Sequence, residues 1–349
     1  MTKIIATLGP ISENLEIQQY FKAHNVQIAR INCSHDTPEN QTAKGLSAKK
    51  AGLEVLMDMP GPKIRMGALD PLTVKIGDKI GLELERAGVE YPHPRNHDGI
   101  TYEILPTRVQ LASFVKEGDD ILIDDGKTHL VVDESIDGVM YCTAVSNGLI
   151  KSGKGINLPI SDVQIDFLTE RDVYMMDGCL AQMRPEYLAC SFVKNAGEVE
   201  RMRGLVREIL AKNKITDYFP KICVKLEMGM ALETDTLTEI MNNCDMVMVA
   251  RGDLALEAKP LHIAVPFLQD KIVAMAKEKG IPVVVATQML ESMLEAPVPT
   301  RAEVSDIYRA VNINKADFIM LSAESASGMY AREAVKFMSD LIDYSATQN

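Results

Sequence analysis

Short runs of Val, Ile and Leu recur along the chain, and segments with helical spacing separate most of them. These runs do not alternate between apolar and polar residues, which is typical of parallel strands covered on both faces. They predict eight strands, at 3–8, 27–32, 53–58, 187–192, 221–227, 246–251, 282–288 and 318–324. Apolar residues at helical spacing predict helices at 197–213, 262–279 and 331–344, among others. Eight strand–helix units indicate an α/β fold, a (β/α)8 TIM barrel, for which about 250 residues are typical.

Residues 67–158 interrupt this pattern. Gly–Asp turns separate short β segments there, such as Leu72 to Ile76 and Leu130 to Val132. This composition predicts a small all-β domain, inserted after the third barrel strand. The barrel itself would then comprise residues 1–66 and 159–349. An insertion at that point would lie above the carboxyl ends of the strands and could act as a lid.

Composition agrees with a soluble globular protein. The 349 residues are 46% hydrophobic and 25% charged, which is ordinary for a globular protein. The longest apolar runs are about seven residues, far short of the roughly 20 that cross a bilayer. Met1 and Thr2 lead straight into a predicted strand, so we expect no signal peptide and a cytoplasmic location.

Cysteine spacing and net charge narrow the function further. The six cysteines show no CxxC pairing, which favours buried free thiols over disulfides or zinc. A formal net charge of −12 argues against a nucleic-acid partner. An anionic substrate would therefore need a local basic site within an acidic protein.

Polar residues follow the apolar part of several predicted strands. They are Arg30, Asn32 and Ser34, then Asp58 and Arg65, Lys225 and Glu227, Arg251 and Asp253, Thr287, and finally Ser322 and Glu324. Strand carboxyl ends converge on one face of a barrel, where this fold holds its active sites. Carboxylates among several cations suit a divalent metal and a phosphorylated ligand. One such residue alone could simply cap or ion-pair a strand end, but six strands sharing the feature favour a site.

Several motifs at these positions resemble those of one family. They are ARINCSH (29–35), KLE (225–227), MVARGDL (248–254), ATQMLESM (286–293), PTRAE (299–303) and IMLSAE (319–324), with IDDG (123–126) and KGINLP (154–159) in the insertion. Their sequence and order resemble the pyruvate kinase family over residues 1 to about 345. The resemblance covers the catalytic barrel and lid of that family, and we expect the usual C-terminal regulatory domain to be lacking.

The resemblance implies transfer of the phosphoryl group of phosphoenolpyruvate to ADP, giving pyruvate and ATP in the last step of glycolysis. It implies that Glu227 and Asp253 bind Mg²⁺ or Mn²⁺, and that the backbone near Gly252 and Asp253 holds the substrate carboxylate. Lys225 and Arg30 would stabilise charge on the phosphoryl group. A purely structural ion pair is the alternative for the metal ligands and for Lys225.

The resemblance also implies nucleotide and proton-transfer groups. Arg65 and Lys154 would contact the nucleotide phosphates, although Lys154 could instead be a solvated loop lysine. Thr287 would lie beside the enolate methylene and help relay its proton, with Ser322 and Glu324 nearby. A threonine hydroxyl is too weak an acid to act alone, so a water chain is implied. Thr287 could otherwise be a structural strand-end residue.

One departure from the family bears on its need for potassium. Asn32, Ser34 and Asp58 match the groups that hold a monovalent cation in the family, but Lys63 replaces a neighbouring glutamate. A lysine ammonium carries the same unit charge as potassium and donates three hydrogen bonds. The sequence therefore predicts that Lys63 fills the pocket and that K⁺ is not required. The alternative is that Lys63 points into solvent.

Other departures leave alternatives open. Met228, Ala255 and Asn40 differ from the family pattern, so substrate and nucleotide preference stay undetermined. A metal-dependent lyase or aldolase acting on a related enolpyruvate or keto acid is a second interpretation, and a non-catalytic relative is a third. Retained Lys225, Arg65 and Lys154 favour the kinase, because an aldolase has no use for a nucleotide lid. We expect a homodimer formed through the barrel, without effector control.

Overall fold

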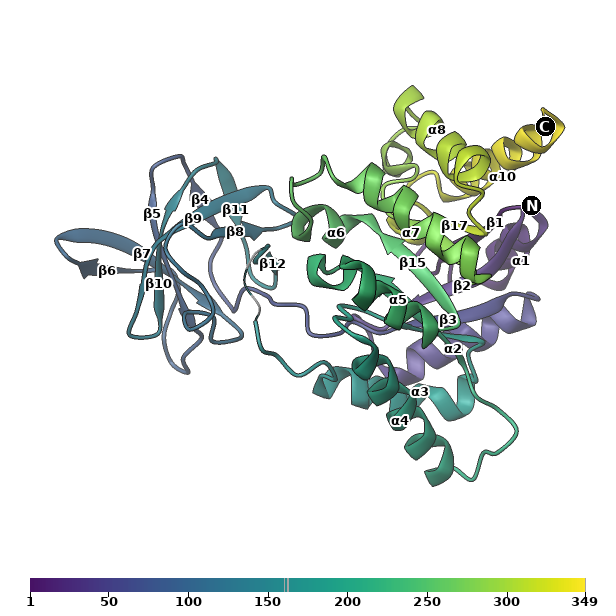
Figure 1. The fold of residues 1–349 in the computed structure, drawn as a ribbon, viewed down its shortest axis with the longest axis horizontal. Helices are drawn as coiled ribbons and strands as arrows, with labels where there is room; N and C mark the ends of the chain where they lie inside the picture. Colours follow the sequence, from purple (N-terminus) through teal and green to yellow (C-terminus); the bar gives the residue numbers. More distant parts are fainter. Residues whose placement is uncertain (160, 162, 349) are drawn as a thin grey trace. The chain divides into compact units, whose positions relative to one another are not determined.

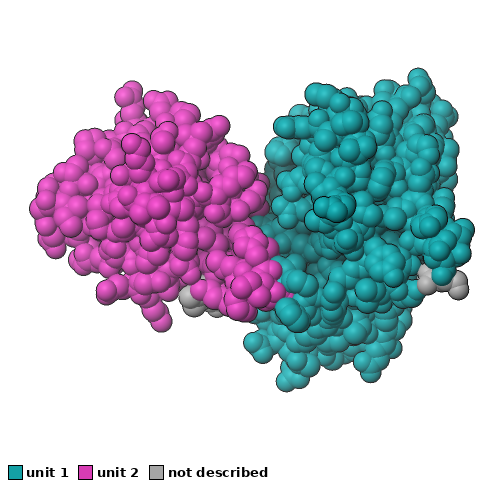
Figure 2. Space-filling view, turned by 90° about the horizontal axis from the view of Figure 1, so that it is seen from above, with its two compact units in different colours: residues 1–61, 167–254, 265–349 teal, residues 62–166, 255–264 magenta. Residues whose placement is uncertain are grey.

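The computed structural model describes residues 1–159, 161 and 163–348, which form two compact units (Figure 1). Unit 1 comprises Met1–Gly61, Phe167–Leu254 and Val265–Asn349. Unit 2 comprises Pro62–Asp166 and Ala255–Ala264 (Figure 2). Both chain termini lie on unit 1.

Unit 1 is a closed barrel of eight parallel strands, in the order β1-β17-β16-β15-β14-β13-β3-β2. The strands are β1 (Lys3–Thr7), β2 (Val26–Asn32), β3 (Glu54–Asp58), β13 (Tyr187–Cys190), β14 (Lys221–Leu226), β15 (Met246–Ala250), β16 (Val283–Ala286) and β17 (Phe318–Leu321). The predicted barrel is confirmed, but several predicted strands extended too far at their carboxyl ends. β16 ends at Ala286 because Thr287 and Gln288 take left-handed conformations, with φ of 72° and 54°, that extended strands do not contain.

Helices surround the barrel (Figure 1). They are α1 (Leu15–Ala23), α2 (Pro38–Lys50), α3 (Glu170–Met183), α4 (Ala196–Lys212), α5 (Thr234–Asn242), α6 (Arg251–Glu257), α7 (Val265–Lys279), α8 (Arg301–Tyr308), α9 (Ala323–Ala326) and α10 (Ala331–Thr347), with short helical turns η1 (Gly229–Leu232), η2 (Glu291–Leu294) and η3 (Arg309–Ile313). Side-chain caps set several starts: Asn195, for example, accepts a hydrogen bond from the Glu198 amide at the start of α4. The helix predicted at 262–279 begins only at Val265, because His262 has a left-handed φ of 58°.

Unit 2 is a β domain with a seven-stranded sheet, in the order β12-β8-β9-β10-β5-β7-β6, and a two-stranded sheet of β11 and β4. Its strands are β4 (Leu72–Val74), β5 (Lys79–Leu84), β6 (His93–His97), β7 (Ile100–Thr107), β8 (Asp120–Ile123), β9 (Thr128–Ile136), β10 (Val139–Ala144), β11 (Gly148–Ile150) and β12 (Ile156–Asn157). A core that includes Leu82, Leu105, Ile121 and Leu130 lies within this unit.

The predicted limits of the insertion, residues 67 and 158, both fall inside unit 2, which also includes residues 255–264. Two side-chain contacts tie that segment to the β domain. Asn157 Nδ2 donates to Glu257 Oε1 at 2.9 Å, where both side chains are buried, and Lys259 Nζ donates to Asp120 Oδ2 at 3.0 Å. Helix α6 thus begins in the barrel unit and ends in unit 2.

The cysteine side chains and the apolar character of the helices complete the description of the fold. All six cysteines are free, and all but the half-buried Cys244 are buried, which confirms the prediction of free thiols. Across the described residues, no helix combines the length and the apolar character that a membrane span requires.

Candidate active site

Four charged side chains form a network at the carboxyl ends of β2, β3 and β14. Arg30 Nε donates to Asp58 Oδ2 at 2.6 Å, and Lys225 Nζ lies 2.9 Å from Glu227 Oε1 and 3.5 Å from Asp58 Oδ1. Both carboxylates are buried, each with 2% of the residue exposed. The structure therefore brings together residues that the sequence placed on three separate strands.

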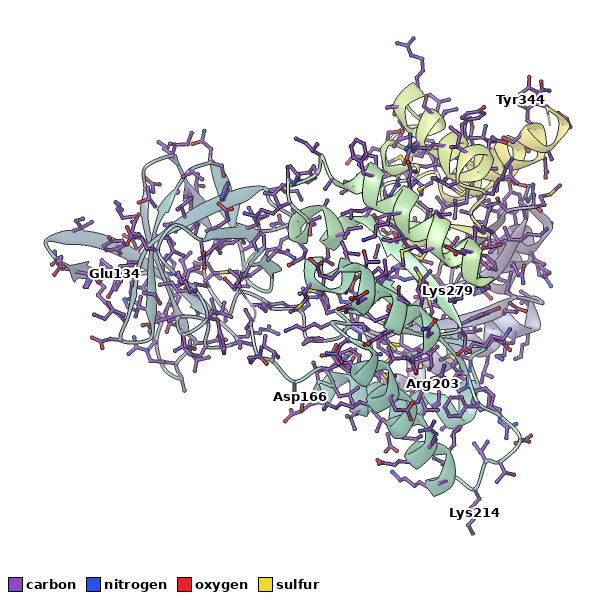
Figure 3. All side chains as sticks on the ribbon, in the orientation of Figure 1. Glu134, Asp166, Arg203, Lys214, Lys279 and Tyr344 are labelled. Carbon is purple, nitrogen blue, oxygen red and sulfur yellow. The ribbon has the colours of Figure 1, made fainter. Side chains whose placement is uncertain are left out.

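This network differs from the charges on the helices around it. Lys214, for example, follows α4 and extends into solvent, as Figure 3 shows. Surface charges of that kind contribute little to stability, because water and salt screen them. Buried charges interact strongly and are retained where neighbours compensate their desolvation.

Burial and neighbouring charges shift the pKa values of the network. Burial favours the neutral form of Asp58, but Lys225 and Arg30 outweigh it and hold the pKa of Asp58 below its usual value. Burial likewise opposes the charge on Lys225, yet Asp58 and Glu227 raise its pKa well above the ordinary value. Burial raises the pKa of Glu227, and Asp253 raises it further, against the opposing effect of Lys225. Lys225 is thus permanently charged. A further positive charge nearby would stabilise the ionised form of Glu227.

Two residues that the sequence analysis missed hold this network. Ser191 follows β13, and its Oγ accepts a hydrogen bond from Lys225 Nζ at 2.7 Å. The backbone N–H of Phe192 donates to Glu227 Oε2 at 2.8 Å. Phe192 has a left-handed φ of 58°, so the chain turns sharply at this point. Their position directly after an apolar strand was the available signal, since the other site residues occupy equivalent positions.

The turn after β15 lies beside the turn after β16. Asp253, half-buried, and the exposed Gly252 lie in the first turn of α6. A Cβ atom on Gly252 would lie 3.7 Å from Cγ2 of Thr287, so these two predicted substrate-binding residues are neighbours. Thr287 Oγ1 is buried and has no hydrogen-bond partner in the described part of the chain. Such an oxygen is available to a ligand or a water molecule.

Arg251 serves as a clamp for this turn. Its guanidinium donates to the carbonyl oxygens of Ala286 at 3.1 Å and Thr287 at 2.6 Å, and it pairs with Asp306 at 2.6 Å. These hydrogen bonds to consecutive carbonyl oxygens hold the left-handed backbone of Thr287 in place. A local clamp of this kind explains its place at a strand end.

Glu324 organises the neighbouring loops. It is buried, and its carboxylate accepts hydrogen bonds from the backbone amides of Ser322 at 2.7 Å and Leu290 at 3.3 Å. Ser322 directly follows β17 and is half-buried. The structure thus places Ser322 and Glu324 together at the carboxyl end of β17.

The three residues matched to a monovalent-cation pocket occupy adjacent strand ends. Asn32 and Asp58 face each other in the register of β2 and β3, and Asn32 Oδ1 accepts from the Ser34 amide at 3.1 Å. Asp58 Oδ1 is buried and accepts no hydrogen bond from the described residues, although the Lys225 ammonium lies 3.5 Å away. A buried acceptor of this kind favours a nearby positive charge.

The residues matched to the nucleotide site and Lys63 all lie in unit 2 and gather around one turn. Arg65 NH1 donates to the Gly153 carbonyl at 3.0 Å, and Lys154 Nζ lies 2.9 Å from Asp124 Oδ1. Cε of Lys63 lies 2.7 Å from where a Cβ on Gly155 would be. This turn therefore collects three cations on the β domain.

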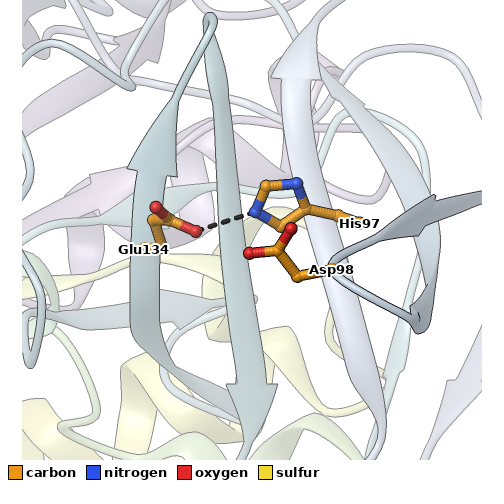
Figure 4. Close-up of side chains that lie close together, drawn as sticks. All are labelled: His97, Asp98 and Glu134. Carbon is orange, nitrogen blue, oxygen red and sulfur yellow. Dashed lines mark hydrogen bonds and ion pairs between the residues drawn. The ribbon is translucent and has the colours of Figure 1, made fainter.

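A separate cluster of possible metal ligands lies on the β domain. Among the described residues, the one group of three suitable side chains whose ligand atoms lie within 4.8 Å of one another is His97, Asp98 and Glu134 (Figure 4). Asp98 and Glu134 are exposed, and His97 Nε2 already pairs with Glu134 at 2.7 Å. The imidazole also stacks on Tyr141, with ring centroids 4.0 Å apart. These contacts describe a hydrogen-bonded and stacked surface cluster.

Glu227 and Asp253 by contrast fit a divalent metal. Burial and the nearby charge of Asp253 raise the pKa of Glu227, and hard carboxylate oxygens are the ligands that Mg²⁺ and Mn²⁺ prefer. The barrel, with this donor set and two adjacent cations at its strand ends, has the groups that a divalent metal and an anionic ligand would need.

Comparison with known proteins gives the family. The family model described as "Pyruvate kinase, barrel domain" matches residues 1–335. Pyruvate kinase of Mycobacterium intracellulare is 36% identical over 346 residues, covering 97% of this chain and 69% of the relative. Pyruvate kinase of Thermotoga maritima is 35% identical over 347 residues, with the same coverage. The crystal structure of a pyruvate kinase from Cryptosporidium parvum matches with a TM-score of 0.88 and 28% identity, over 99% of this chain and 69% of that one. The chain belongs to the pyruvate kinase family.

Proposed function

We propose that this chain transfers the phosphoryl group of phosphoenolpyruvate to ADP, giving pyruvate and ATP. The supporting observation is a permanently charged Lys225 held 2.9 Å from Glu227, a buried carboxylate suited to a divalent metal. A cation and a metal ligand at this distance match what phosphoryl transfer requires, namely positive charge on both sides of the group in flight.

In the proposed reaction, the bond between phosphorus and the enol oxygen breaks while a bond to an oxygen of the ADP β-phosphate forms. Negative charge spreads over the phosphoryl oxygens during this exchange. Lys225 and Arg30 would stabilise that charge, and the Asp58 carboxylate between them keeps both cations in place. The buried position strengthens the effect, because little water screens the charges.

Glu227 and Asp253 would hold the divalent metal, Mg²⁺ or Mn²⁺. When bound, the metal would supply positive charge to the carboxylate and enolate oxygens of the substrate. The first turn of α6, at Gly252 and Asp253, would offer backbone N–H groups to the same carboxylate.

The enolate that remains must gain a proton at carbon. Thr287 Oγ1, buried and without a partner among the described residues, is the group we assign beside that carbon. Ser322 and Glu324 would complete a chain of water molecules to solvent. Since Glu324 already accepts two backbone amides, it would fix the orientation of this chain as a neighbouring acceptor.

On the β domain, Arg65 and Lys154 would bind the phosphates of ADP, so that the domain acts as a lid. Lys154 is 39% exposed and pairs with Asp124. Because the lysine is exposed to solvent, which weakens its ion pair, a nucleotide phosphate could replace the carboxylate at modest cost.

We also propose that the enzyme needs no potassium. The buried oxygen Asp58 Oδ1 and the side chain of Asn32 would accept a positive charge that Lys63 supplies. Phe267, Tyr308 and Ile313 are exposed on barrel helices and would suit the homodimer interface that the family resemblance implies, which light scattering can test.

A lactate-dehydrogenase-coupled assay tests the function. With Mg²⁺, phosphoenolpyruvate and ADP, NADH should be consumed, and omission of any of the three should abolish the signal. Several nucleoside diphosphates should be compared, because Asn40 leaves nucleotide preference open. Pyruvate formed from a keto acid in the absence of nucleotide, with no phosphoryl transfer, would instead indicate a lyase or aldolase.

A further inference from the structure

We propose that Ser191 is a positioning residue for phosphoryl transfer, which fixes the Lys225 ammonium and links it to the chain segment leading from β3 to unit 2. This proposal rests on the proposed function. The serine lies directly after β13 and is 2% exposed. Its hydroxyl forms hydrogen bonds with Lys225 of the charged network and with Met59 of the segment, and the donor and acceptor of each bond are fixed.

The directions of these two hydrogen bonds follow from which groups carry protons. An ammonium can only donate, so Ser191 Oγ must accept from Lys225 Nζ, at 2.7 Å. The single hydroxyl proton of the serine is then left for the carbonyl oxygen of Met59, at 2.7 Å. Neither contact can reverse its direction. The serine thus forms a one-way bridge from Lys225 to the Met59 carbonyl.

The bridge matters because the other contacts of Lys225 are to carboxylates. Its remaining short contact is to Glu227 Oε1 at 2.9 Å, while Asp58 Oδ1 lies at 3.5 Å. Glu227 is also a proposed metal ligand, so a bound metal would compete with Lys225 for that carboxylate. Ser191 would then be the short contact that does not depend on metal occupancy. A flexible four-carbon side chain without this anchor would sample positions away from the phosphoryl group.

The far end of the bridge is the last part of unit 1 before unit 2 begins at Pro62. The Met59 amide donates to the Ala189 carbonyl at 3.0 Å, and the Gly61 amide donates to Asp172 Oδ1 at 3.1 Å. A Cβ on Gly61 would lie 2.8 Å from the Ser191 carbonyl oxygen, so only glycine permits this close approach. Ser191 therefore joins this segment to Lys225, alongside the Asp58 carboxylate that precedes Met59.

A purely structural role is the competing interpretation, since a buried carbonyl needs a donor. Ser339 provides a matched control. It is also buried, at 4% exposed, and its Oγ accepts a side-chain hydrogen bond from Asn25 Nδ2 at 3.1 Å, but its partner is not a site residue. Ser191→Ala and Ser339→Ala thus remove equivalent groups, and Ser191→Cys preserves bulk while weakening the acceptor.

We expect Ser191→Ala to lower kcat by about 10- to 100-fold, as is usual when a group that orients a site residue is removed. KM for phosphoenolpyruvate should change by less than about threefold, because substrate binding is retained. Ser191→Cys should recover thermal stability but not kcat, and Ser339→Ala should leave kcat unchanged. In a Lys225→Met background, Ser191→Ala should cost little more, since no ammonium remains to be positioned.

Two results would overturn the proposal: a kcat within about threefold of wild type in Ser191→Ala, or full multiplication of the two losses in the double variant. If the wild type itself shows no turnover, the proposed function fails and the positioning can still be judged. NMR of protein labelled with ¹⁵N-lysine gives a second measurement. The slowly exchanging ammonium signal of Lys225 is identified by its disappearance in Lys225→Met. This signal should also be lost in Ser191→Ala and kept in Ser339→Ala. A persistent signal in Ser191→Ala would refute the positioning role.

Discussion

Replacing Lys225 with methionine removes one charge from the site and keeps an unbranched side chain of similar length. The ammonium lies 2.9 Å from Glu227 and 3.5 Å from Asp58, and Arg30 remains as the second cation. If the phosphoryl group in flight lies about 4 Å from this charge, the lost interaction is about 4 kcal/mol at an effective dielectric constant of about 20. Because about 1.36 kcal/mol corresponds to a factor of ten, kcat should fall by at least about 10³-fold.

The same substitution should also lower stability in the absence of metal. Asp58 keeps its contact to Arg30 at 2.6 Å, but Glu227 loses the cation that opposes the rise of its pKa on burial. Breaking a buried ion pair by removing one partner typically costs about 3–5 kcal/mol. Mg²⁺ would restore part of this loss by supplying charge at Glu227, so thermal unfolding should be measured with and without the metal.

The assay for Lys225→Met is the coupled one, run at saturating Mg²⁺ with a raised enzyme concentration. KM for phosphoenolpyruvate should stay within a few-fold of wild type, because the contacts assigned to the substrate carboxylate are untouched. Lys212→Met is the control, since Lys212 is 66% exposed and pairs with Asp177 at the surface. A kcat within about tenfold of wild type, or a loss confined to KM, would remove Lys225 from the stabilisation of the transferred group.

Three further predictions follow from the charged residues. The pKa of Glu227 is raised and the metal binds the carboxylate form, so Mg²⁺ affinity should increase as pH rises through that pKa. Calorimetry in buffers of different ionisation enthalpy should detect the proton that is released on binding. Mg²⁺ binding that does not depend on pH would contradict this prediction. Wild-type turnover in tetramethylammonium buffer should not respond to KCl at fixed ionic strength, whereas Lys63→Glu should become K⁺-dependent; a severalfold response of the wild type would refute the assignment of Lys63. Lys154→Ala should raise KM for ADP by about tenfold, equivalent to about 1.4 kcal/mol, and leave KM for phosphoenolpyruvate unchanged; equal effects on both would place Lys154 elsewhere.

The barrel could be predicted from the sequence because each of its elements carries a local signal. Strands buried on both faces are continuous apolar runs, and the surrounding helices repeat every 3.6 residues. The segment 255–264 carried no such signal. Its place in unit 2 depends on contacts such as that between Lys259 and Asp120, which are 139 residues apart, and residue pairs at that separation leave no local periodicity.

The site could be predicted only where its residues are chemically conspicuous. Charged groups that end an apolar strand, such as Lys225 and Asp58, are costly to bury, and this cost makes them visible in a sequence. Ser191 is not visible in this way, because a small buried serine is ordinary in any core. Arg251 shows the opposite case, since its charge marks it as a site residue while its partners are backbone carbonyls and Asp306. Identifying which conspicuous charge acts on a ligand requires knowing where its hydrogen bonds go.

The charge balance of the site explains why an acidic protein could take an anionic substrate. Among the groups of unit 1, the cations Arg30 and Lys225 face three carboxylates, Asp58, Glu227 and Asp253, which leaves this set with a net negative charge. A protein with a formal net charge of −12 provides no long-range attraction for phosphoenolpyruvate either. A divalent cation at Glu227 and Asp253 would reverse the sign of the site. The two carboxylates would therefore make substrate binding conditional on the metal. Without the metal, Asp58 and Glu227 neutralise Lys225 and Arg30. Once the metal is in place, these two cations would be released to act on the phosphoryl group.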